Sequence, residues 1–447
     1  MNMPLRLPHP AAQRGVASLI VVMVLLFVVS LVAAYTSRNL IFEQRTSTNQ
    51  YRATQALEAA EAGLEWTLSM LNQGRIDTNC DNSASTTPTT FRGRYLAFDT
   101  TPASPNYGVV SVVASQVAAG AYPTCISAGS TWNCSCPDNT ATPALTPPAD
   151  GLVHPTFRVR FWTRSPYTAR PGLVYVEVNG CTSNSDTCLG FGPASGGIAD
   201  EGRATVTALV SLISGLPAIP TAAVTARGTV NASSTLGLTV ANGDAAAGVT
   251  IQAGGVVTPG SMNLISAPGT PSSSAGVVSS DPGLQNLPDA NAMFASTFNM
   301  NRLTYQQQQA AVEIDCGGTC NGATLRSYTT LNPGRVFWLN GDLNLDSAGA
   351  VGSATEPVMV YVTGSASITA TGVTVNGVIY SAAADWTFND ASSGTVNGAI
   401  IAEGNLAGAS TAAIVYDPNI LKLMRFTTGS FVRVPGGWKD WKDVNAP

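Results

Sequence analysis

The chain has 447 residues, a formal net charge of −5, 45% hydrophobic residues and only 11% charged residues. Its 22 basic residues form no stripe of the kind that nucleic-acid binding requires, so we expect no direct nucleic-acid partner. The eight cysteines begin only at Cys80, and their even number favours an oxidising compartment over the cytoplasm.

The first clear element is an apolar segment close to the N-terminus. A short leader ends at Gly15, and the residues from Val16 to Tyr35 follow without a charge. At about 1.5 Å per residue, such a helix spans roughly 30 Å, the thickness of a bilayer's hydrocarbon core. A secretory signal has a shorter apolar region that is followed by a small-residue cleavage site. Here the small residue comes first, so cleavage after Gly15 would leave the apolar helix on the mature protein.

The helix is expected to continue beyond the membrane as an amphipathic segment, so that residues 16–72 form one helix. Its apolar positions recur at a spacing of three or four residues: Leu57, Ala60, Leu64, Leu68 and Leu71. Within it, residues 55–64 read QALEAAEAGL. Together with the leader glycine and the uncharged span, this block resembles the N-terminal region of the PilX family of minor pilins.

The resemblance implies a pathway of processing and assembly. In this family a prepilin peptidase cuts after the glycine, here Gly15, and N-methylates the new terminus, here Val16. The span from Val16 to Tyr35 would lie in the inner membrane before assembly and in the filament core afterwards. The implied partners are other minor pilins, the major pilin and the prepilin peptidase. Residues 1–15 are then the prepilin leader.

One position departs from the commonest pilin pattern. Major pilins usually carry a glutamate as the fifth residue after the cut, where it pairs with the terminal amine of a neighbouring subunit; here that residue is Ile20. Because a buried charge is costly without its partner, a subunit that lacks the carboxylate fits best at the end of a filament. PilX-type minor pilins and the K-type pseudopilin of type II secretion share this absence. Drift at a tolerant position is the alternative interpretation.

Charges around the span indicate its orientation. Arg6 and Arg14 precede it and no acidic residue does, so the N-terminus is expected in the cytoplasm and the C-terminal domain in the periplasm. Disulfides are therefore expected. The candidates are Cys80, Cys125, Cys134, Cys136, Cys181, Cys188, Cys316 and Cys320. Residues 181 and 188, and residues 316 and 320, are spaced for local loops, and Cys80 is expected to pair within the cluster at 125–136.

After the helix, a pilin-like β head is predicted over residues 73–215. Its candidate strands, each rich in Val, Phe, Tyr or Thr, are residues 94–98, 108–115, 156–163, 173–178 and 203–212. The helix would pack on this sheet. Residues 122–151, rich in Cys, Pro and Thr, are interpreted as a stapled surface loop.

The composition changes after residue 215 to Val, Thr, Gly, Ala and Asn with few charges. The triplet V-N-G occurs at 375–377 and returns at 396–398. Short strands that return at such a period, separated by Gly and Asn, are typical of a β-solenoid. Residues 216–430 are therefore predicted to form a right-handed β-helix or solenoid with a helical insertion at 284–315, followed by a C-terminal tail at 431–447. A β-sandwich is the alternative.

Catalytic and metal sites find little support in the sequence. Four aspartates of the second region invite comparison with the carboxylates of β-helical polysaccharide hydrolases and lyases: Asp342, Asp346, Asp385 and Asp390. In residues 340–346, Asn340, Asp342, Asn344 and Asp346 alternate along one strand face, a pattern that an exposed, solvated strand or a loose Ca²⁺ site explains as well. His154 is the only histidine after the span, and the C-x2-C spacing of zinc sites is absent. No catalytic residue, metal or cofactor is predicted.

The sequence thus predicts an α+β protein, with a long pilin helix on an antiparallel sheet followed by a mainly β domain, that is not an enzyme. It would act as a minor pilin that helps to initiate a type IV pilus and is displayed extracellularly at or near the tip. There the solenoid would mediate adhesion, through a surface glycan or a tip adhesin, or support twitching motility. The alternatives are a type II secretion minor pseudopilin and a membrane-anchored β-helical protein that binds or acts on carbohydrate.

Overall fold

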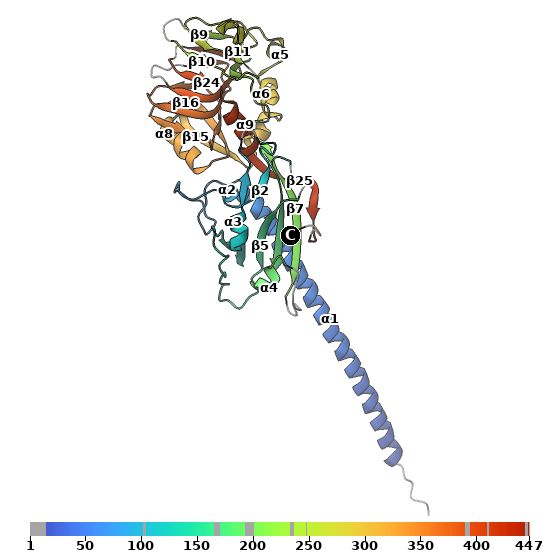
Figure 1. The fold of residues 1–447 in the computed structure, drawn as a ribbon. Helices are drawn as coiled ribbons and strands as arrows, with labels where there is room; N and C mark the ends of the chain where they lie inside the picture. The colour runs from blue at the N-terminus through green and yellow to red at the C-terminus, as the bar shows by residue number, and fades with distance from the viewer. Residues whose placement is uncertain are drawn as a thin grey trace, which may run out of the picture.

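A long helix, a β-sheet head and a stack of parallel strands follow one another along the protein (Figure 1). The computed structural model describes residues 15–101, 104–164, 170–192, 201–232, 237–246, 248–388, 394–408, 411–442 and 446. The leader residues before Gly15, with Arg6 and Arg14, lie outside this described part, as does Asp390. Helix α1 projects from one side of the head, and the strand stack lies at the other end (Figure 1).

Helix α1 runs from Gly15 to Leu71 without a break. Its 57 residues make about 85 Å of helix. The segment contains no proline, and its only glycine after the first residue is Gly63, so nothing in the sequence interrupts the backbone ladder. The long N-terminal helix that the sequence predicts is confirmed, and it ends one residue earlier than expected.

The head is a six-stranded antiparallel sheet on which α1 packs. In order across the sheet, its strands are β25 (Gly429–Lys439), β7 (Arg203–Ser214), β6 (Leu173–Cys181), β5 (Thr156–Trp162), β3 (Thr124–Ala128) and β4 (Thr131–Ser135). Helix α1 contacts β5, β6 and β7, and Leu64, Phe157 and Val178 are completely or almost completely buried between helix and sheet. The predicted α+β arrangement of a long helix on an antiparallel sheet is confirmed.

Shorter elements complete the head and differ in part from the prediction. They are α2 (Phe91–Tyr95), β1 (Leu96–Phe98), β2 (Val110–Val112), α3 (Ala114–Ala119) and α4 (Asp186–Leu189). The strand predicted at 94–98 therefore begins two residues late, because Thr90 caps a short helix before it. The surface loop predicted at 122–151 is wrong in its first part, where β3 and β4 form a hairpin that extends the sheet.

Beyond β7 the chain forms a stack of short strands, all paired in parallel. The first run of strands is β8 (Ala222–Ala226), β9 (Val230–Ala232), β10 (Thr239–Ala241), β11 (Val249–Ala253), β12 (Val257–Thr258), β13 (Asn263–Ile265) and β14 (Val277–Val278). The second run is β15 (Ala311–Asn321), β16 (Val336–Leu345), β17 (Gly349–Val351), β18 (Val358–Val362), β19 (Ala366–Ile368), β20 (Val373–Ser381), β21 (Asp385–Thr387), β22 (Thr395–Ala402), β23 (Asn405–Gly408) and β24 (Ala413–Val415). We call residues 222–415 the strand stack.

The spatial order of the stack differs from its order in the sequence. Strands β15, β16, β18, β20 and β22 pair in succession, and β22 then pairs with β8, which is followed by β11 and β14. The first run of strands therefore extends the second run at its end, where β8 pairs with β22. Helices α5 (Pro282–Gln285), α6 (Ala290–Phe298) and α7 (Arg302–Gln306) carry the chain from β14 at one end to β15 at the other. The predicted helical insertion at 284–315 is too long, because residues from Ala311 onward belong to β15.

Equivalent residues of the V-N-G triplets are neighbours in the stack. Asn376 pairs with Asn397 and Gly377 with Gly398, and the Asn397 side-chain amide donates to Asn376 Oδ1 at 3.1 Å. Gly398 has a φ of +139°, and a Cβ there would collide with the carbonyl oxygen of Gly377. Glycine is therefore required at this point of the strand, because both the backbone conformation and the close approach exclude a side chain.

Aromatic and charged side chains fix the connecting helices on the stack. Phe294 of α6 lies edge-on to Tyr361 of β18 and Tyr380 of β20. Arg302 of α7 pairs with the buried Glu403 at 2.6 Å and also donates to the Tyr361 hydroxyl. The Tyr380 hydroxyl donates to the same carboxylate at 2.7 Å. Burial raises the pKa of Glu403, whereas its hydrogen bonds with Tyr380 and Arg302 oppose that shift.

The chain returns to the head after the stack. Helix α9 (Pro418–Thr427) packs on β20, β22 and β7, and the chain then enters β25, which pairs with β7 on both sides of an irregularity between Arg433 and Trp438. The prediction of a C-terminal tail at 431–447, beyond a terminal β domain, is therefore wrong. Phe431 is completely buried in the head core, which explains why the returning strand stays with the sheet. The stack is inserted between two neighbouring strands of the head.

Candidate functional site: helix α1 and the joint at its end

The first half of α1 is exposed apolar helix. Ile20 and Tyr35 expose 57% and 68% of their surface, and the side chains around them are similarly uncovered. The most apolar window of the helix has a mean hydropathy of 2.8 and is not buried inside the protein, so α1 is long and apolar enough to cross a membrane. Gly15 and Val16 begin the helix. Cleavage and N-methylation at these two residues stay predictions.

The second half of α1 contains the QALEAAEAGL block, which packs against the sheet of the head. Ala56 and Ala60 are completely buried against the head, and a Cβ at Gly180 of β6 would collide with the Ala56 carbonyl oxygen. Gly63 also lies directly against the sheet, since a Cβ there would be 2.7 Å from the side chains of Phe157 and Val178. The small residues of the block thus let the helix and sheet backbones approach closely. Its glutamates, Glu58 and Glu61, are both exposed to solvent.

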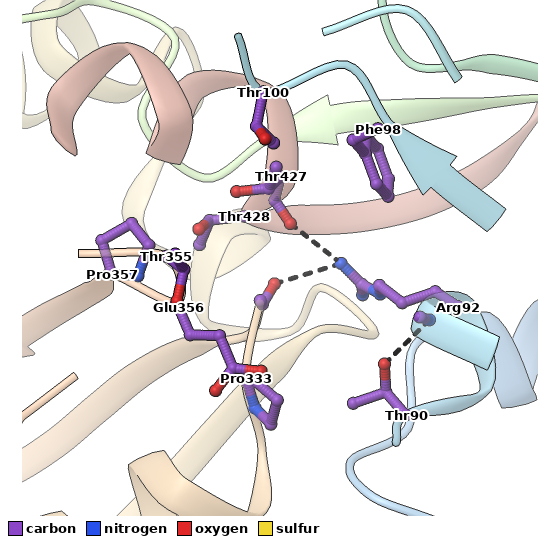
Figure 2. A pocket seen from close by; sticks show the side chains of 12 residues that line it. Thr90, Arg92, Phe98, Thr100, Pro333, Thr355, Glu356, Pro357, Thr427 and Thr428 are labelled. Carbon is purple, nitrogen blue, oxygen red and sulfur yellow. Dashed lines mark hydrogen bonds between the residues drawn. The ribbon is translucent and has the colours of Figure 1, made fainter. Parts of the chain in front are cut away.

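Arg92 lies at the joint where α1, the head and the stack meet (Figure 2). Its side chain is buried and donates four hydrogen bonds to backbone carbonyls: Leu71 at the end of α1, Gly334 before β16, Thr427 of α9 and Gly429 of β25. Burial, followed by the charge of Arg335, lowers the pKa of Arg92 to about 9. One cation thus connects segments that are widely separated in the sequence.

A small cavity of about 220 Å³ adjoins Arg92, lined also by Phe98, Glu356 and Thr428 (Figure 2). Arg75, four residues beyond the last residue of α1, reaches across the joint and pairs with Glu356 at 3.0 Å. Sequence reasoning missed both arginines. Neither stands in a motif, and their partners come from distant segments, so no local pattern identifies them.

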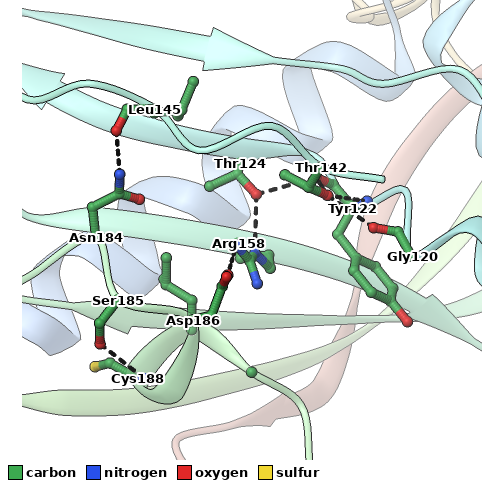
Figure 3. A network of polar contacts seen from close by, with 12 residues as sticks. Gly120, Tyr122, Thr124, Thr142, Leu145, Arg158, Asn184, Ser185, Asp186 and Cys188 are labelled. Carbon is green, nitrogen blue, oxygen red and sulfur yellow. Dashed lines mark hydrogen bonds and ion pairs between the residues drawn. The ribbon is translucent and has the colours of Figure 1, made fainter. Parts of the chain in front are cut away.

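A second polar network holds the chain that follows the β3–β4 hairpin against the head (Figure 3). Arg158 of β5 pairs with Asp186 at 2.8 Å and donates to the Thr124 hydroxyl at 3.1 Å. The Thr142 hydroxyl bonds the backbone near Gly120 and Tyr122, and the Asn184 side chain donates to the Leu145 carbonyl. The segment around residues 142–145 is therefore bonded at several points to the connections that flank β3 and β6.

The structure joins the eight cysteines in four disulfides. The pairs are Cys80–Cys136, Cys125–Cys134, Cys181–Cys188 and Cys316–Cys320. The two local loops and the pairing of Cys80 within the 125–136 cluster agree with the spacing argument. Cys125–Cys134 links the paired strands β3 and β4, and Cys80–Cys136 ties the segment after α1 to the same hairpin.

The aspartates of the stack have separate structural partners. Asp342 accepts a hydrogen bond from the Ser365 amide at 2.8 Å, and Asp385 accepts one from the Asn405 side chain at 2.7 Å. Asp346 accepts from the Gly322 amide at 3.1 Å, at the start of α8 (Gly322–Leu331). Within the part of the chain that the structure describes, no group of three His, Cys, Asp or Glu side chains is placed to hold a metal ion. Each of these three aspartates therefore links its own strand or turn to the neighbouring segment of the stack.

Comparison with known proteins bears on the N-terminal helix. The family model described as PilX N-terminal matches residues 14–65. A similar solved structure is that of the competence-associated pilin ComZ from Thermus thermophilus, with 12% identity, coverage of 87% of this chain and 97% of that chain, and a TM-score of 0.23. No curated protein matches the chain. The family match includes Gly15, the whole apolar span and the small-residue block, so the N-terminal segment of this chain is similar to that of PilX-type minor pilins.

Proposed function

We propose that the protein is a minor pilin that helps to initiate assembly of a type IV pilus. The observation that carries this proposal is the PilX N-terminal match over residues 14–65, which joins the cleavage glycine, the membrane helix and the packing block in one segment. Before assembly, the chain is anchored in the inner membrane by α1, with its C-terminal parts in the periplasm. A prepilin peptidase cuts after Gly15 and methylates Val16, and the helix then packs with those of other minor pilins and the major pilin.

Ile20 supports a position at or near the tip. This residue replaces the carboxylate that would neutralise a neighbour's terminal amine, and an amine in an apolar filament core is costly without such a partner. The first subunit of a filament has no subunit beyond it whose amine requires neutralising. A subunit with isoleucine at this position is therefore best tolerated at the end of the filament.

The strand stack would be the part displayed. We interpret its parallel coils as a β-solenoid, which presents long regular flanks to a partner. Its insertion between β7 and β25, with the contacts of Arg92, joins it to the head through two chain connections rather than one. Adhesion to a surface glycan, a tip adhesin or another cell is the role that this geometry supports.

The tip position is tested by restoring the missing carboxylate. In cells that lack the native protein, Ile20→Glu is expected to allow the epitope-labelled chain to enter the filament along its length, whereas the unaltered chain is labelled at the ends. Ile20→Gln is the matched control, because it adds polarity and similar size without the charge. Equal labelling along the shaft by the unaltered chain and by both variants would refute the tip position.

A further inference from the structure

Arg92, the cation buried at the cavity of the joint, has no carboxylate partner among the described residues (Figure 2). Its side chain is 4% exposed, and all four of its hydrogen-bond acceptors are backbone carbonyls. A guanidinium carries five N–H donors, so one N–H on Nη2 is left without an acceptor in this part of the chain. A buried charge is costly without a counter-charge. An anion that enters the cavity would therefore be stabilised by Arg92.

Arg335 adds a second positive charge beside the cavity. It directly follows Gly334, which lines the cavity, and its side chain donates to three backbone carbonyls and to the side-chain oxygen of Asn332. Burial lowers the pKa of Arg335 to about 10, and burial, followed by the charge of Arg335, lowers the pKa of Arg92 to about 9. The two cations repel each other, and a bound anion would offset that repulsion.

Glu356 is the one acidic side chain among the described residues that line the cavity, and it has a cation of its own. Arg75 donates to both of its carboxylate oxygens, at 3.0 and 3.3 Å. The Glu356 side chain is about half exposed, so water also screens its charge. The Glu356 carboxylate therefore does not replace the missing partner of Arg92.

Thr428 provides an independent sign that the cavity can hold a polar ligand. This residue lines the cavity and is completely buried, yet its hydroxyl has no hydrogen-bond partner within the described part of the chain. A buried hydroxyl without a partner is uncommon and costs free energy. Figure 2 shows Thr428 across the cavity from Arg92. An oxygen of a bound anion could accept hydrogen bonds from both residues.

The size and the other walls of the cavity restrict the kind of anion. A cavity of about 150 Å³ can hold a benzene ring, so one of about 220 Å³ has room for a six-membered ring with substituents. Phe98, Pro333 and Pro357 supply apolar walls, and the threonines at 100 and 355 are exposed at the mouth. A sugar ring has an apolar C–H face and hydroxyl groups at its edge, which suit these walls and this mouth.

We propose that the cavity at the joint binds a hexuronate unit of a surface glycan, with the sugar carboxylate against Arg92 and Thr428. The inference rests on the proposed function in one respect, because the glycan is the one that the adhesive role requires. It assigns that role to a site between the head and the strand stack, since Phe98 of β1 and Pro357 before β18 line the same cavity. A bound sugar would contact both parts.

Calorimetric titration of the full chain in detergent tests the ligand class. The probes are sodium glucuronate, neutral glucose and the cationic sugar glucosamine, all at the same ionic strength. Glucuronate is expected to bind, and the other two are not, because only glucuronate carries the carboxylate. No binding of glucuronate, or equal binding of glucose, would overturn the proposal. The methyl glycoside of glucuronate, which imitates a unit within a glycan, should bind as well as the free acid, and its failure to bind would refute the glycan as the source.

Two conservative variants locate the binding in the cavity. Thr428→Val is expected to weaken glucuronate binding about tenfold, because it removes a hydrogen bond to a charged group and keeps the shape of the side chain. Thr225→Val is the matched control, since Thr225 also has a buried hydroxyl without a partner in the described chain but lies in β8, away from the cavity. Glu356→Gln should tighten binding severalfold, because it removes a repelling carboxylate and frees the charge of Arg75.

Thermal unfolding of each variant without ligand shows that it is folded, and Arg92 is left unaltered because it holds the joint together. Thr428→Val binding as tightly as Thr225→Val, or weaker binding by Glu356→Gln, would refute the site. Processing after Gly15 is read on the same preparations. A processed chain that does not bind glucuronate refutes this inference alone, and an unprocessed chain that binds it refutes the proposed function alone.

Discussion

Asn72 and Phe431 are joined by two reciprocal hydrogen bonds. The Phe431 amide donates to Asn72 Oδ1 at 2.8 Å, and Asn72 Nδ2 donates to the Phe431 carbonyl at 2.9 Å. Asn72 directly follows α1, and Phe431 lies in β25, the strand by which the chain returns from the stack. The same Asn72 amide also reaches Gln309 before β15 at 2.7 Å. One side chain therefore binds the end of α1 to both the head and the stack.

Replacing Asn72 by alanine is expected to lower the free energy of unfolding by about 2 kcal/mol, because it leaves a buried amide and a buried carbonyl of Phe431 without their partners. The measurement is the denaturant midpoint of the full chain in detergent. Asn49→Ala is the matched control, since Asn49 is exposed on the same helix. A midpoint for Asn72→Ala equal to that of the control would show that the joint does not depend on this residue.

Gly398→Ala is expected to destabilise the stack by about 3 kcal/mol, because a side chain at φ +139° is strained and its Cβ would meet the Gly377 carbonyl. Gly243→Ala serves for comparison, since a Cβ at Gly243 would meet no atom within 4 Å. Thermal unfolding of the two variants distinguishes the effects. Similar melting temperatures would contradict the close approach of the strands.

Arg302→Met is expected to cost about 3 kcal/mol at neutral pH, because it leaves the Glu403 carboxylate buried without its cation. Burial already raises the pKa of Glu403. In the variant, protonation removes the uncompensated charge, so stability should rise as the pH falls toward that raised pKa. Denaturant unfolding at pH 7.5 and pH 5 measures both effects.

The double variant Arg302→Met with Glu403→Gln should recover part of the lost stability and lose the pH dependence, since no buried charge is left. Arg433→Met is the control for an exposed pair and should cost less than about 1 kcal/mol. An Arg302→Met chain as stable as this control at both pH values would show that the ion pair does not hold α7 on the stack.

His154 should give the head a pH-dependent stability. Its ring bonds Asp150 at 2.7 Å and the Ser127 carbonyl at 2.8 Å, and the Asp150 hydrogen bond raises the pKa of His154 above its ordinary value. Backbone bonding to Leu152, then the His154 contact, lowers the pKa of Asp150. The contribution of the pair is therefore greatest between the two pKa values, and it is lost as pH rises through the raised pKa of His154.

The measurement is the unfolding midpoint at pH 5.5 and pH 8.5, and an NMR titration of the single histidine after the leader gives its pKa directly. His154→Asn should remove the difference in stability between the two pH values that this pair contributes. An unaltered pH profile in the variant, or a His154 pKa at or below its ordinary value, would contradict the assignment.

Local patterns in the sequence were sufficient for the parts of the fold that depend on near neighbours. The uncharged span and the 3–4 spacing of Leu64 and Leu68 predict α1, and the V-N-G triplets pair as their spacing suggests. The cysteine loop at 181–188 closes over a short distance. In each case the deciding interaction joins residues that are no more than about twenty positions apart in the sequence.

The parts that escaped prediction depend on distant partners. Strand β25 contains Pro435 followed by two glycines, a composition typical of an irregular tail rather than a strand. It pairs with β7 because Phe431 is buried in the head core. The sequence period of the stack does not indicate that β8 pairs with β22. Arg92 has no neighbouring motif, since its four acceptors come from separate segments. Contacts of such long sequence separation leave no local signal.

The mature N-terminus tests the central claim most directly. Mass spectrometry of the chain from membranes should find it beginning at an N-methylated Val16, and this form should disappear both in Gly15→Val and in cells without the prepilin peptidase. That result would place the protein in the pilus pathway. An intact leader, or a cut beyond Tyr35 that removes the apolar helix, would contradict a role as a pilin.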